Sequence, residues 1–224
     1  VEDNVFWMGQ KEFYVYGGAV QRIPCTVRDY VFSDFNSDQG EKVTAATNTA
    51  FSEVWWFYPS ANSEENDRYV VYNYQQQIWY YGTMTRTCWV DRGINQYPIA
   101  ASTDHVLYLQ ELGFNDGSTV PEAPLVTSIA SSPIDIQDGD EFAFISRIFP
   151  DLRIRPESGA GAMANFTIRV RNNTSESFAK EVIVPYTGDD QQVQVRLRGR
   201  QFSVKIDSNT VDTAWRLGSP RLDI

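Results

Sequence analysis

The chain has 224 residues, a formal net charge of −10, 42% hydrophobic residues and 14% aromatic residues. Such an acidic chain is a poor candidate for a protein that binds nucleic acid by neutralising phosphates. No run of about 18 apolar residues is present, so the sequence predicts no membrane-spanning helix, and we expect no signal peptide from the pattern at Val1–Asn4.

Aromatic and β-branched residues are concentrated in short runs in the first half of the chain. These residue types suit strands that are at least half-buried, and each buried ring removes about 150–250 Å² from water. We therefore expect a dense, aromatic-packed β structure. The runs are Val5–Met8, Phe13–Tyr16, Val54–Tyr58, Tyr69–Tyr74 and Ile78–Tyr81.

One helix interrupts these strands. Apolar residues at helical spacing over Val27–Phe35 predict it, with Thr26 as a candidate N-cap and Asp29 three residues later. The polar stretch Asn36–Asn48 is interpreted as a spacer.

A four-stranded unit is predicted after the spacer. Its strands are Ser52–Tyr58, Tyr69–Tyr74, Ile78–Tyr81, which ends before Gly82, and Thr87–Val90. Repeated four-stranded units of this length are typical of β-propellers, so we expect a propeller-like region. Two further strands are predicted near Tyr97–Ala101 and Val106–Gln110.

The composition changes at Ser118–Pro124, and we place the domain boundary between residues 120 and 121. Beyond it, apolar and polar residues alternate over Phe166–Arg171, Val193–Arg198 and Phe202–Asp207. Alternation with period 2 predicts antiparallel strands with one buried face. The expected fold is all-β: an aromatic-rich, propeller-like region over 1–120 with one short helix, and an antiparallel β-sandwich or barrel over 121–224.

The acidity is uneven along the chain. Residues 1–126 contain 7 Lys and Arg against 16 Asp and Glu, whereas residues 127–224 contain 12 against 13. This asymmetry indicates two regions with different neighbours.

Catalytic motifs are scarce. His105 is the single histidine, which excludes a His-based metal cluster and leaves one candidate for a Ser-His-Asp triad. We interpret it as an ordinary loop or strand-edge histidine. The acidic stretch Asp135–Glu141 has oxygen ligands suited to Ca²⁺ but lacks EF-hand spacing, so it is interpreted as a solvated turn. We expect no cofactor and no metal.

Paired carboxylates are the alternative source of chemistry, because glycoside hydrolysis needs two of them about 5–10 Å apart. Asp67, Asp91, Asp104 and Glu111 lie near predicted strand ends and are the candidates.

Basic side chains occupy the polar positions of the three alternating strands. A solvated face, a subunit interface with bidentate Arg–carboxylate pairs and a nucleic-acid surface are all open interpretations. The candidate interface residues are Arg169, Arg171, Arg196, Arg198, Arg200 and Lys205.

Two cysteines, Cys25 and Cys88, are interpreted as buried free thiols, since a domain of this size needs no disulfide.

Five segments taken together resemble a known family. They are Glu53–Ser60 (EVWWFYPS), Asp67–Tyr74 (DRYVVYNY), Trp79–Gly82 (WYYG), Gly199–Phe202 (GRQF) and Trp215–Asp223 (WRLGSPRLD). In this order they resemble the tail hub or nozzle proteins of short-tailed bacteriophages, a group that includes tail tubular protein B and the packaged-DNA stabilisation proteins.

The resemblance implies a virion protein with no catalytic residues. It implies a ring, usually six-fold, that extends the DNA-ejection channel, retains the packaged genome and contacts the adaptor and the fibres or spikes. Duplex DNA would pass through without specific binding, and assembly would occur in the bacterial host cytoplasm. Members of the family are longer than 224 residues, so the chain would be part of a longer protein.

We therefore expect a structural tail component that is not an enzyme and has no membrane anchor. A non-catalytic carbohydrate-binding or host-recognition module is the main alternative, followed by a β-propeller glycoside hydrolase.

Overall fold

The computed structural model describes residues 1–135, 139, 141–156, 161, 163–188 and 192–223. Over these residues the protein is all-β, with several antiparallel sheets and two short helices. The chain divides into two compact units, Val1–Leu112 and Gly113–Ile224. The expected boundary at residue 120 falls within the second unit, between strands β11 (Asn115–Asp116) and β12 (Ala123–Pro124), which pair with each other.

The first unit begins with a three-stranded antiparallel sheet. Its strands are β1 (Val5–Met8), β2 (Phe13–Tyr16) and β3 (Val20–Ile23). Aromatic runs predict the first two strands. The third was not predicted, because Gln21 and Arg22 leave it without an aromatic or continuous apolar pattern.

Helix α1 (Arg28–Asp34) follows, and it lies within the predicted helical segment. Its N-cap is Val27, and no side chain caps the helix, so the predicted cap at Thr26 is wrong. Packing of the buried Val31 and the partly buried Phe32 into the adjacent core stabilises the helix instead, as is usual for helices this short.

The second sheet has four antiparallel strands in chain order. They are β4 (Thr44–Asn48), β5 (Glu53–Tyr58), β6 (Arg68–Asn73) and β7 (Ile78–Thr83).

This sheet differs from the predicted four-stranded unit in one strand. The segment predicted as a spacer contains the 3₁₀ helix η1 (Ser37–Lys42) and strand β4. The predicted fourth strand, β8 (Cys88–Val90), belongs to the next sheet. Strand β4 has the sequence Thr-Ala-Ala-Thr-Asn, and these small and polar side chains give no strand pattern. Its pairing with β5 stabilises the strand instead.

All six residues of β5 are buried. Val54, Trp56 and Tyr58 point to one face of the sheet, and Trp55 and Phe57 point to the other. A strand covered on both faces has a continuous apolar sequence instead of an alternating one, which explains the run from Val54 to Tyr58.

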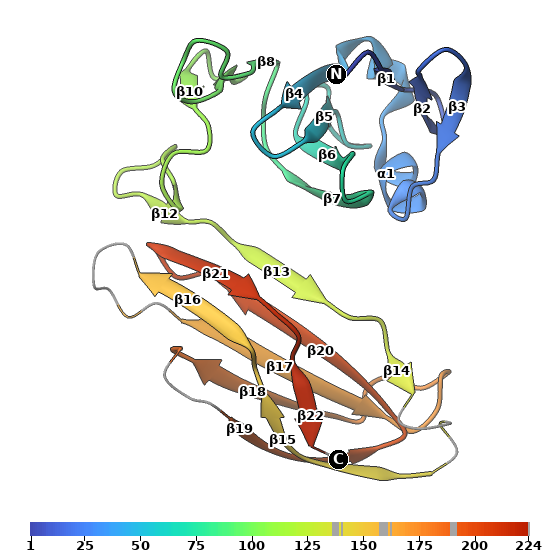
Figure 1. The fold of residues 1–224 in the computed structure, drawn as a ribbon, viewed down its shortest axis with the longest axis vertical. Coiled ribbons are helices and arrows are strands. Elements are labelled where there is room, and N and C mark those ends of the chain that lie inside the picture. Colours follow the sequence, from blue (N-terminus) through green and yellow to red (C-terminus); the bar gives the residue numbers. More distant parts are fainter. Residues whose placement is uncertain (136–138, 140, 157–160, 162, 189–191, 224) are drawn as a thin grey trace. The chain divides into compact units, whose positions relative to one another are not determined.

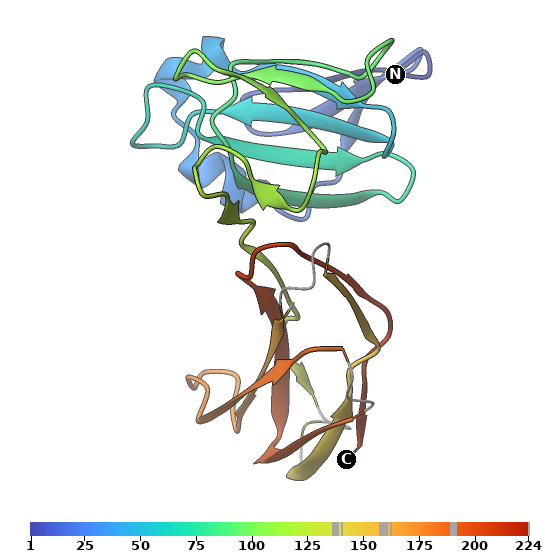
Figure 2. The same ribbon diagram turned by 90° about the vertical axis from the view of Figure 1, so that its left-hand side faces the viewer.

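The third sheet contains β8, β9 (Ile99–Ala101) and β10 (Leu107–Leu109), with β9 in the middle. The last two strands lie within the two segments predicted for them. Figure 1 and Figure 2 show the three sheets of the first unit one after another, with the four-stranded sheet in the middle.

Two aromatic cores cover the two faces of the middle sheet. On the face towards β1–β3, the ring of Phe13 lies 4.9 Å from Trp56 and 4.7 Å from Trp79 between centroids. On the face towards β8–β10, Trp55 stacks on Trp89 at 5.3 Å. The three sheets are therefore joined by ring-to-ring packing.

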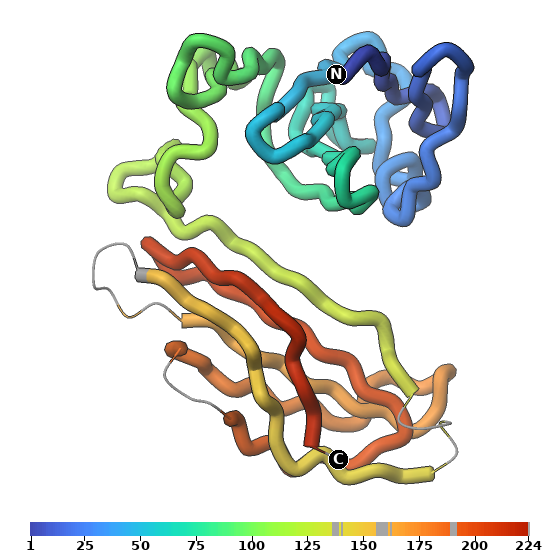
Figure 3. The backbone as a smooth tube through the Cα atoms, viewed as in Figure 1, coloured from blue at the N-terminus to red at the C-terminus, as the bar shows by residue number. Residues whose placement is uncertain are grey.

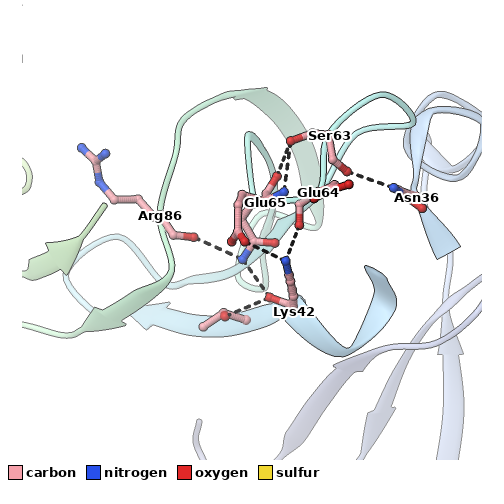
Figure 4. Close-up of polar contacts among 8 residues, drawn as sticks. Asn36, Lys42, Ser63, Glu64, Glu65 and Arg86 are labelled. Carbon is pink, nitrogen blue, oxygen red and sulfur yellow. Dashed lines mark hydrogen bonds and ion pairs between the residues drawn. The ribbon is translucent and has the colours of Figure 1, made fainter. Parts of the chain in front are cut away.

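A network of polar contacts anchors the loop between β5 and β6 (Figure 4). The Lys42 ammonium donates to the backbone oxygen of Glu64 and to the carboxylate of Glu65, both at 2.7 Å. Asn66 is 2% exposed, and its amide donates to the carbonyls of Lys42 at 2.8 Å and Arg86 at 3.2 Å. One buried amide thus links η1, this loop and the segment after β7.

The second unit contains the remaining twelve strands of the described residues, two of them introduced above; Figure 3 traces their path. The other ten are β13 (Thr127–Ala130), β14 (Ile134–Asp135), β15 (Ala143–Phe149), β16 (Leu152–Pro156), β17 (Ala164–Arg171), β18 (Lys180–Tyr186), β19 (Val193–Gly199), β20 (Gln201–Ser208), β21 (Thr213–Leu217) and β22 (Arg221–Asp223).

These strands form three antiparallel sheets besides the β11–β12 pair. One has the order β13-β20-β17-β18, with β14 also paired to β20; the second is β19-β15-β22 and the third is β16-β21. The alternation predicted for β17, β19 and β20 is confirmed, since their apolar residues enter one common core. That core is mainly aliphatic, with Ile145, Ile168, Leu197 and Ile206 all buried.

A β-bulge interrupts the pairing of β15 with β19. Ile145 pairs with Leu197, but Arg147 pairs with Gln194, so β19 has one extra residue at this point. Arg196 takes up the extra residue with φ 65°, a left-handed conformation that costs a non-glycine residue about 1–2 kcal/mol.

Both cysteines are free, as expected, but they are less buried than predicted: Cys25 is half-buried and Cys88 is exposed. Burial raises the pKa of the Cys25 thiol to about 11. No helix of the described residues is long and apolar enough to cross a membrane.

Candidate functional site

The four candidate carboxylates do not converge on one site. Asp67 accepts hydrogen bonds from the Ser60 backbone nitrogen at 2.7 Å and the Ser60 hydroxyl at 2.8 Å, which closes the loop between β5 and β6. Asp91 accepts one from the Thr49 nitrogen at 3.0 Å, and the exposed Asp104 accepts one from Tyr108 at 3.1 Å. These three carboxylates hold turns together.

Glu111 is the exception, because it lies beside a second carboxylate, Glu53, that sequence reasoning did not select. The Asn48 side-chain amide bridges the two, with its nitrogen 3.1 Å from a Glu111 oxygen and 3.5 Å from a Glu53 oxygen. Glu53 also accepts hydrogen bonds from Trp55 Nε1 at 3.0 Å and from the Tyr80 hydroxyl.

The electrostatics of this pair follow from burial and from the like charges. Partial burial of the carboxyl group, together with the neighbouring Glu53, raises the pKa of Glu111, and the Asn48 amide opposes the shift. Burial and the carboxylate of Glu53 raise the pKa of Tyr80 as well. Glu53 is 8% exposed, and it accepts its hydrogen bonds from Asn48, Trp55 and Tyr80. The pair therefore fits an internal polar link better than a pair of carboxylates that binds substrate.

The signal for Glu53 was present in the sequence. It precedes the fully buried run of β5, and a carboxylate next to such a run needs hydrogen-bond donors. Only the fold shows that Asn48, Trp55 and Tyr80 provide them.

His105 lies in the tight turn between β9 and β10, where its backbone nitrogen donates to the Ser102 carbonyl at 3.1 Å. Its φ of 65° belongs to the left-handed region that tight turns use. This loop position agrees with the sequence interpretation. The acidic stretch Asp135–Glu141 lies largely outside the described residues. Within the described part of the chain, no group of three or more His, Cys, Asp or Glu side chains could hold a metal ion.

The six basic candidates fall on two different sheets of the second unit. Arg169 on β17 pairs with Glu181, and Arg171 donates to Gln201 at 2.7 Å. Lys205 on the adjacent β20 pairs with Asp207 at 3.1 Å. These three side chains therefore lie on the outer face of the five-stranded sheet, where Arg169 and Lys205 form ion pairs and Arg171 bonds to a neutral amide.

The other three belong to β19 and the turn that follows it. Arg196 and Arg198 are exposed there, and both Arg198 and Arg200 place their guanidinium groups 4.9 Å from the centre of the Phe142 ring. Contacts of this kind are cation–π interactions. The fold thus divides the predicted basic stripe into two groups on separate sheets.

The outer face of the third sheet of the first unit is entirely apolar. Trp89 and Ala100 point inward to the core, and the alternating positions therefore point outward. We call this the aliphatic face; Val90 is 61% exposed, Leu107 72% and Leu109 54%. Its residues are Cys88, Val90, Ile99, Ala101, Leu107 and Leu109.

The first sheet, at the other end of the same unit, has a second uncovered face. Phe13 and Ile23 are buried in the core, which leaves the alternating positions outside. Trp7 and Tyr14 are opposite each other there and stack with their centroids 5.4 Å apart. We call this the aromatic face; its residues are Val5, Trp7, Tyr14, Tyr16, Val20 and Arg22.

The sequence missed both faces as candidate sites. Its aromatic runs predict strands, but an alternating strand does not reveal which of its faces a neighbouring sheet covers. Both faces are candidates for assembly, because contiguous exposed apolar patches on folded domains mark interaction sites.

Comparison with known proteins returned no matching family model and no matching curated protein sequence.

Proposed function

We propose that the chain is a structural component of a phage tail hub or nozzle that assembles into a homo-oligomeric ring. The observation that carries this proposal is the stack of three sheets in the first unit, which ends in the aliphatic face on one side and the aromatic face on the other. Face-to-face stacking of small antiparallel sheets supports a propeller-like region, and the single aliphatic core of the second unit supports a sandwich or barrel.

Two different apolar faces on one unit suit a head-to-tail contact. The aliphatic face of one copy would pack against the aromatic face of the next, in the way that the sheets inside the unit already pack. Contacts between unlike surfaces generate closed rings when the rotation between copies permits. The resemblance in sequence adds the expectation of six copies, of attachment to adaptor and fibre or spike proteins, and of a place in the virion tail after assembly in the host cytoplasm.

A structural role without catalysis accords with the carboxylates of the first unit. Asp67, Asp91 and Asp104 accept hydrogen bonds in turns, and Glu53 lies within an internal polar link. The net charge of −10 would weaken non-specific attraction of duplex DNA that passes through the ring.

The decisive experiment changes one face and measures assembly. The purified chain should form concentration-dependent rings, observed by sedimentation velocity and negative-stain electron microscopy. Leu107→Asp should weaken association by at least about tenfold, because a carboxylate in an apolar interface is not solvated. Ile183→Asp introduces the same charge at a 58% exposed residue of the second unit and should leave association unchanged.

Near-ultraviolet circular dichroism establishes that both variants remain folded. Wild-type protein that stays monomeric at all micromolar concentrations, or equal effects of the two variants, would contradict the proposal.

One observation favours a second candidate, a carbohydrate-binding or host-recognition module. The stacked rings of Trp7 and Tyr14 lie on an outer face, and exposed aromatic rings are a common surface for sugars. Under this alternative, Trp7→Ala would abolish binding to bacterial-surface glycans while sedimentation remains unchanged. A glycoside hydrolase would instead lose measurable turnover of a sugar polymer in Glu53→Gln or Glu111→Gln.

A further inference from the structure

The two-stranded sheet β16–β21 has an outer surface rich in arginine. Its apolar residues, among them Leu152 and Leu217, face the core of the second unit. The alternating positions Arg153, Arg155 and Arg216 therefore point outward, with Ala214 as the fourth outward residue across from Arg155. The sequence pattern does not single out these arginines.

Arg153 and Arg216 are direct cross-strand partners. Side chains in this relation have their Cβ atoms about 4.5–5.5 Å apart, and like charges there are destabilising. Neither guanidinium forms an ion pair or hydrogen bond with any residue that the structure describes. The strand pairing therefore keeps two cations together without a compensating anion in the described part of the chain.

Both arginines line a surface cavity of about 1160 Å³. Arg221 contributes a third guanidinium, and it lies 5.7 Å from the ring of Phe149 in the same wall. Asp151 is the one carboxylate among the described lining residues, and one of its oxygens accepts a hydrogen bond from the Ser219 backbone nitrogen at 2.6 Å. Among the lining residues that the structure describes, the cavity thus has three cations against one carboxylate that already accepts a hydrogen bond.

We propose that this cavity binds a ligand with two or more neighbouring phosphate groups. The guanidinium group presents several N–H donors in a planar fork that matches phosphate oxygens, and it stays charged at any physiological pH. The cavity is far larger than a single phosphate, since a water molecule occupies about 30 Å³ in the liquid. Phe149, Pro150 and Leu217 add an apolar wall beside the cations.

A phosphate chain between Arg153 and Arg216 would neutralise their repulsion. Ligand binding and strand stability are therefore coupled: the residues that bind the ligand destabilise the empty site. This coupling distinguishes a binding role from a solvated arginine surface, and it does not depend on ring assembly.

The first measurement uses the full chain and sodium tripolyphosphate at constant ionic strength. Calorimetry should show that the melting temperature of the second unit rises with tripolyphosphate concentration, as for any ligand that binds the folded state. Sodium sulfate at the same ionic strength measures the unspecific salt effect. Absence of a tripolyphosphate-specific shift, together with absence of oligonucleotide binding in the last experiment, overturns the proposal.

Single variants test the coupling. Arg153→Gln and Arg216→Gln should each raise the melting temperature of the ligand-free protein and weaken tripolyphosphate binding about tenfold, a loss of about 1.4 kcal/mol. Arg92→Gln removes the same charge from an exposed loop of the first unit and should change neither quantity. Equal weakening by Arg92→Gln would reduce the effect to overall charge and overturn the site.

The last experiment separates the two sources of phosphate groups. A ten-residue oligothymidylate is titrated against the same variants over a range of salt concentrations. Contact with three consecutive phosphates of a single strand predicts a slope of log K against log salt of about −2. Tighter binding of the oligonucleotide than of tripolyphosphate assigns the cavity to a nucleic-acid strand, and the reverse order assigns it to a free oligophosphate.

Discussion

The two units of this protein build β structure in opposite ways. In the first, the middle sheet is buried on both faces, and aromatic rings fill both cores. In the second, the five-stranded sheet buries one face against aliphatic residues, and its other face carries paired charges such as Arg169 with Glu181. A continuous aromatic run and a clean alternation in the sequence therefore indicate how many faces of a sheet are covered.

The greatest loss of stability is expected when a residue on the second covered face of the middle sheet is replaced, and the matching change on the outer face of β17 should cost little. Phe57 is fully buried on the β8–β10 side of β5, so Phe57→Ala should destabilise the first unit by about 3–5 kcal/mol. Arg169 lies on the outer face of β17 in an ion pair whose two side chains are 38% and 40% exposed. Arg169→Ala should cost less than about 1 kcal/mol, because solvent screens the pair. Calorimetry checks both, and similar losses in the two variants would remove the distinction between the units.

Substitutions in the loops are expected to change stability less. Asn66→Ala removes a buried amide that joins two backbone carbonyls, and about 1–3 kcal/mol should be lost in chemical denaturation. Asn173 in the second unit provides the matched control, because among the described residues its side-chain amide donates only to the exposed Glu176, at 2.8 Å. Asn173→Ala should change stability by less than about 0.5 kcal/mol. A neutral Asn66→Ala would mean that the network in Figure 4 does not stabilise the first unit.

Substitution of one buried tyrosine in each unit by phenylalanine is expected to change stability in opposite directions. The buried Tyr58 hydroxyl has no hydrogen-bond partner among the described residues, so Tyr58→Phe should stabilise the protein by about 1 kcal/mol. Tyr186 in the second unit donates to the Leu152 carbonyl at 3.4 Å, so Tyr186→Phe should destabilise by about 0.5–1 kcal/mol. Urea denaturation measures both changes, and destabilisation by Tyr58→Phe would reveal a partner for its hydroxyl.

The smallest effect depends on pH. The folded-state pKa of Glu111 is raised above its unfolded value, so the stability that this group contributes is complete below about pH 4.3 and is lost as pH rises through the folded pKa. Glu111→Gln keeps the group neutral. It should match the wild type at low pH and exceed it at pH 7 by about 0.5 kcal/mol, a small gain because Glu111 is partly solvated.

Stability curves of Glu111→Gln and wild type at several pH values test this sign. Glu41→Gln, a change at an exposed residue of η1, controls for net charge. A Glu111→Gln variant that is less stable than wild type at pH 7 would show that the carboxylate is held ionised by Asn48.

Local sequence pattern determined those strands whose own residues form an aromatic run or a clean alternation. The aromatic runs specified β1, β2, β5, β6 and β7, and strict alternation specified β17, β19 and β20, because each run already matches the pleat and the burial of its strand. Strands β3 and β4 have little apolar character of their own and are held by their neighbours, so a pattern could not reveal them.

Gly82 shows how an interpretation from pattern differs from the tertiary reason. The sequence predicts that Gly82 ends the strand, but β7 continues to Thr83. Tyr69 is its cross-strand partner on β6, and a Cβ at position 82 would lie 2.7 Å from the Tyr69 ring atom Cε1. The residue is a glycine because a ring from the adjacent strand occupies the space of a side chain.

The candidate sites belong entirely to the tertiary structure. The sequence contains the acidity, the aromatic content and every arginine, but it does not state which residues become neighbours. Glu53 meets Glu111 through Asn48, and Arg153 meets Arg216 through strand pairing. The aliphatic and aromatic faces exist because a stack of three sheets has two ends. Each of these features joins residues distant in sequence, and only long-range strand pairing and packing bring them together.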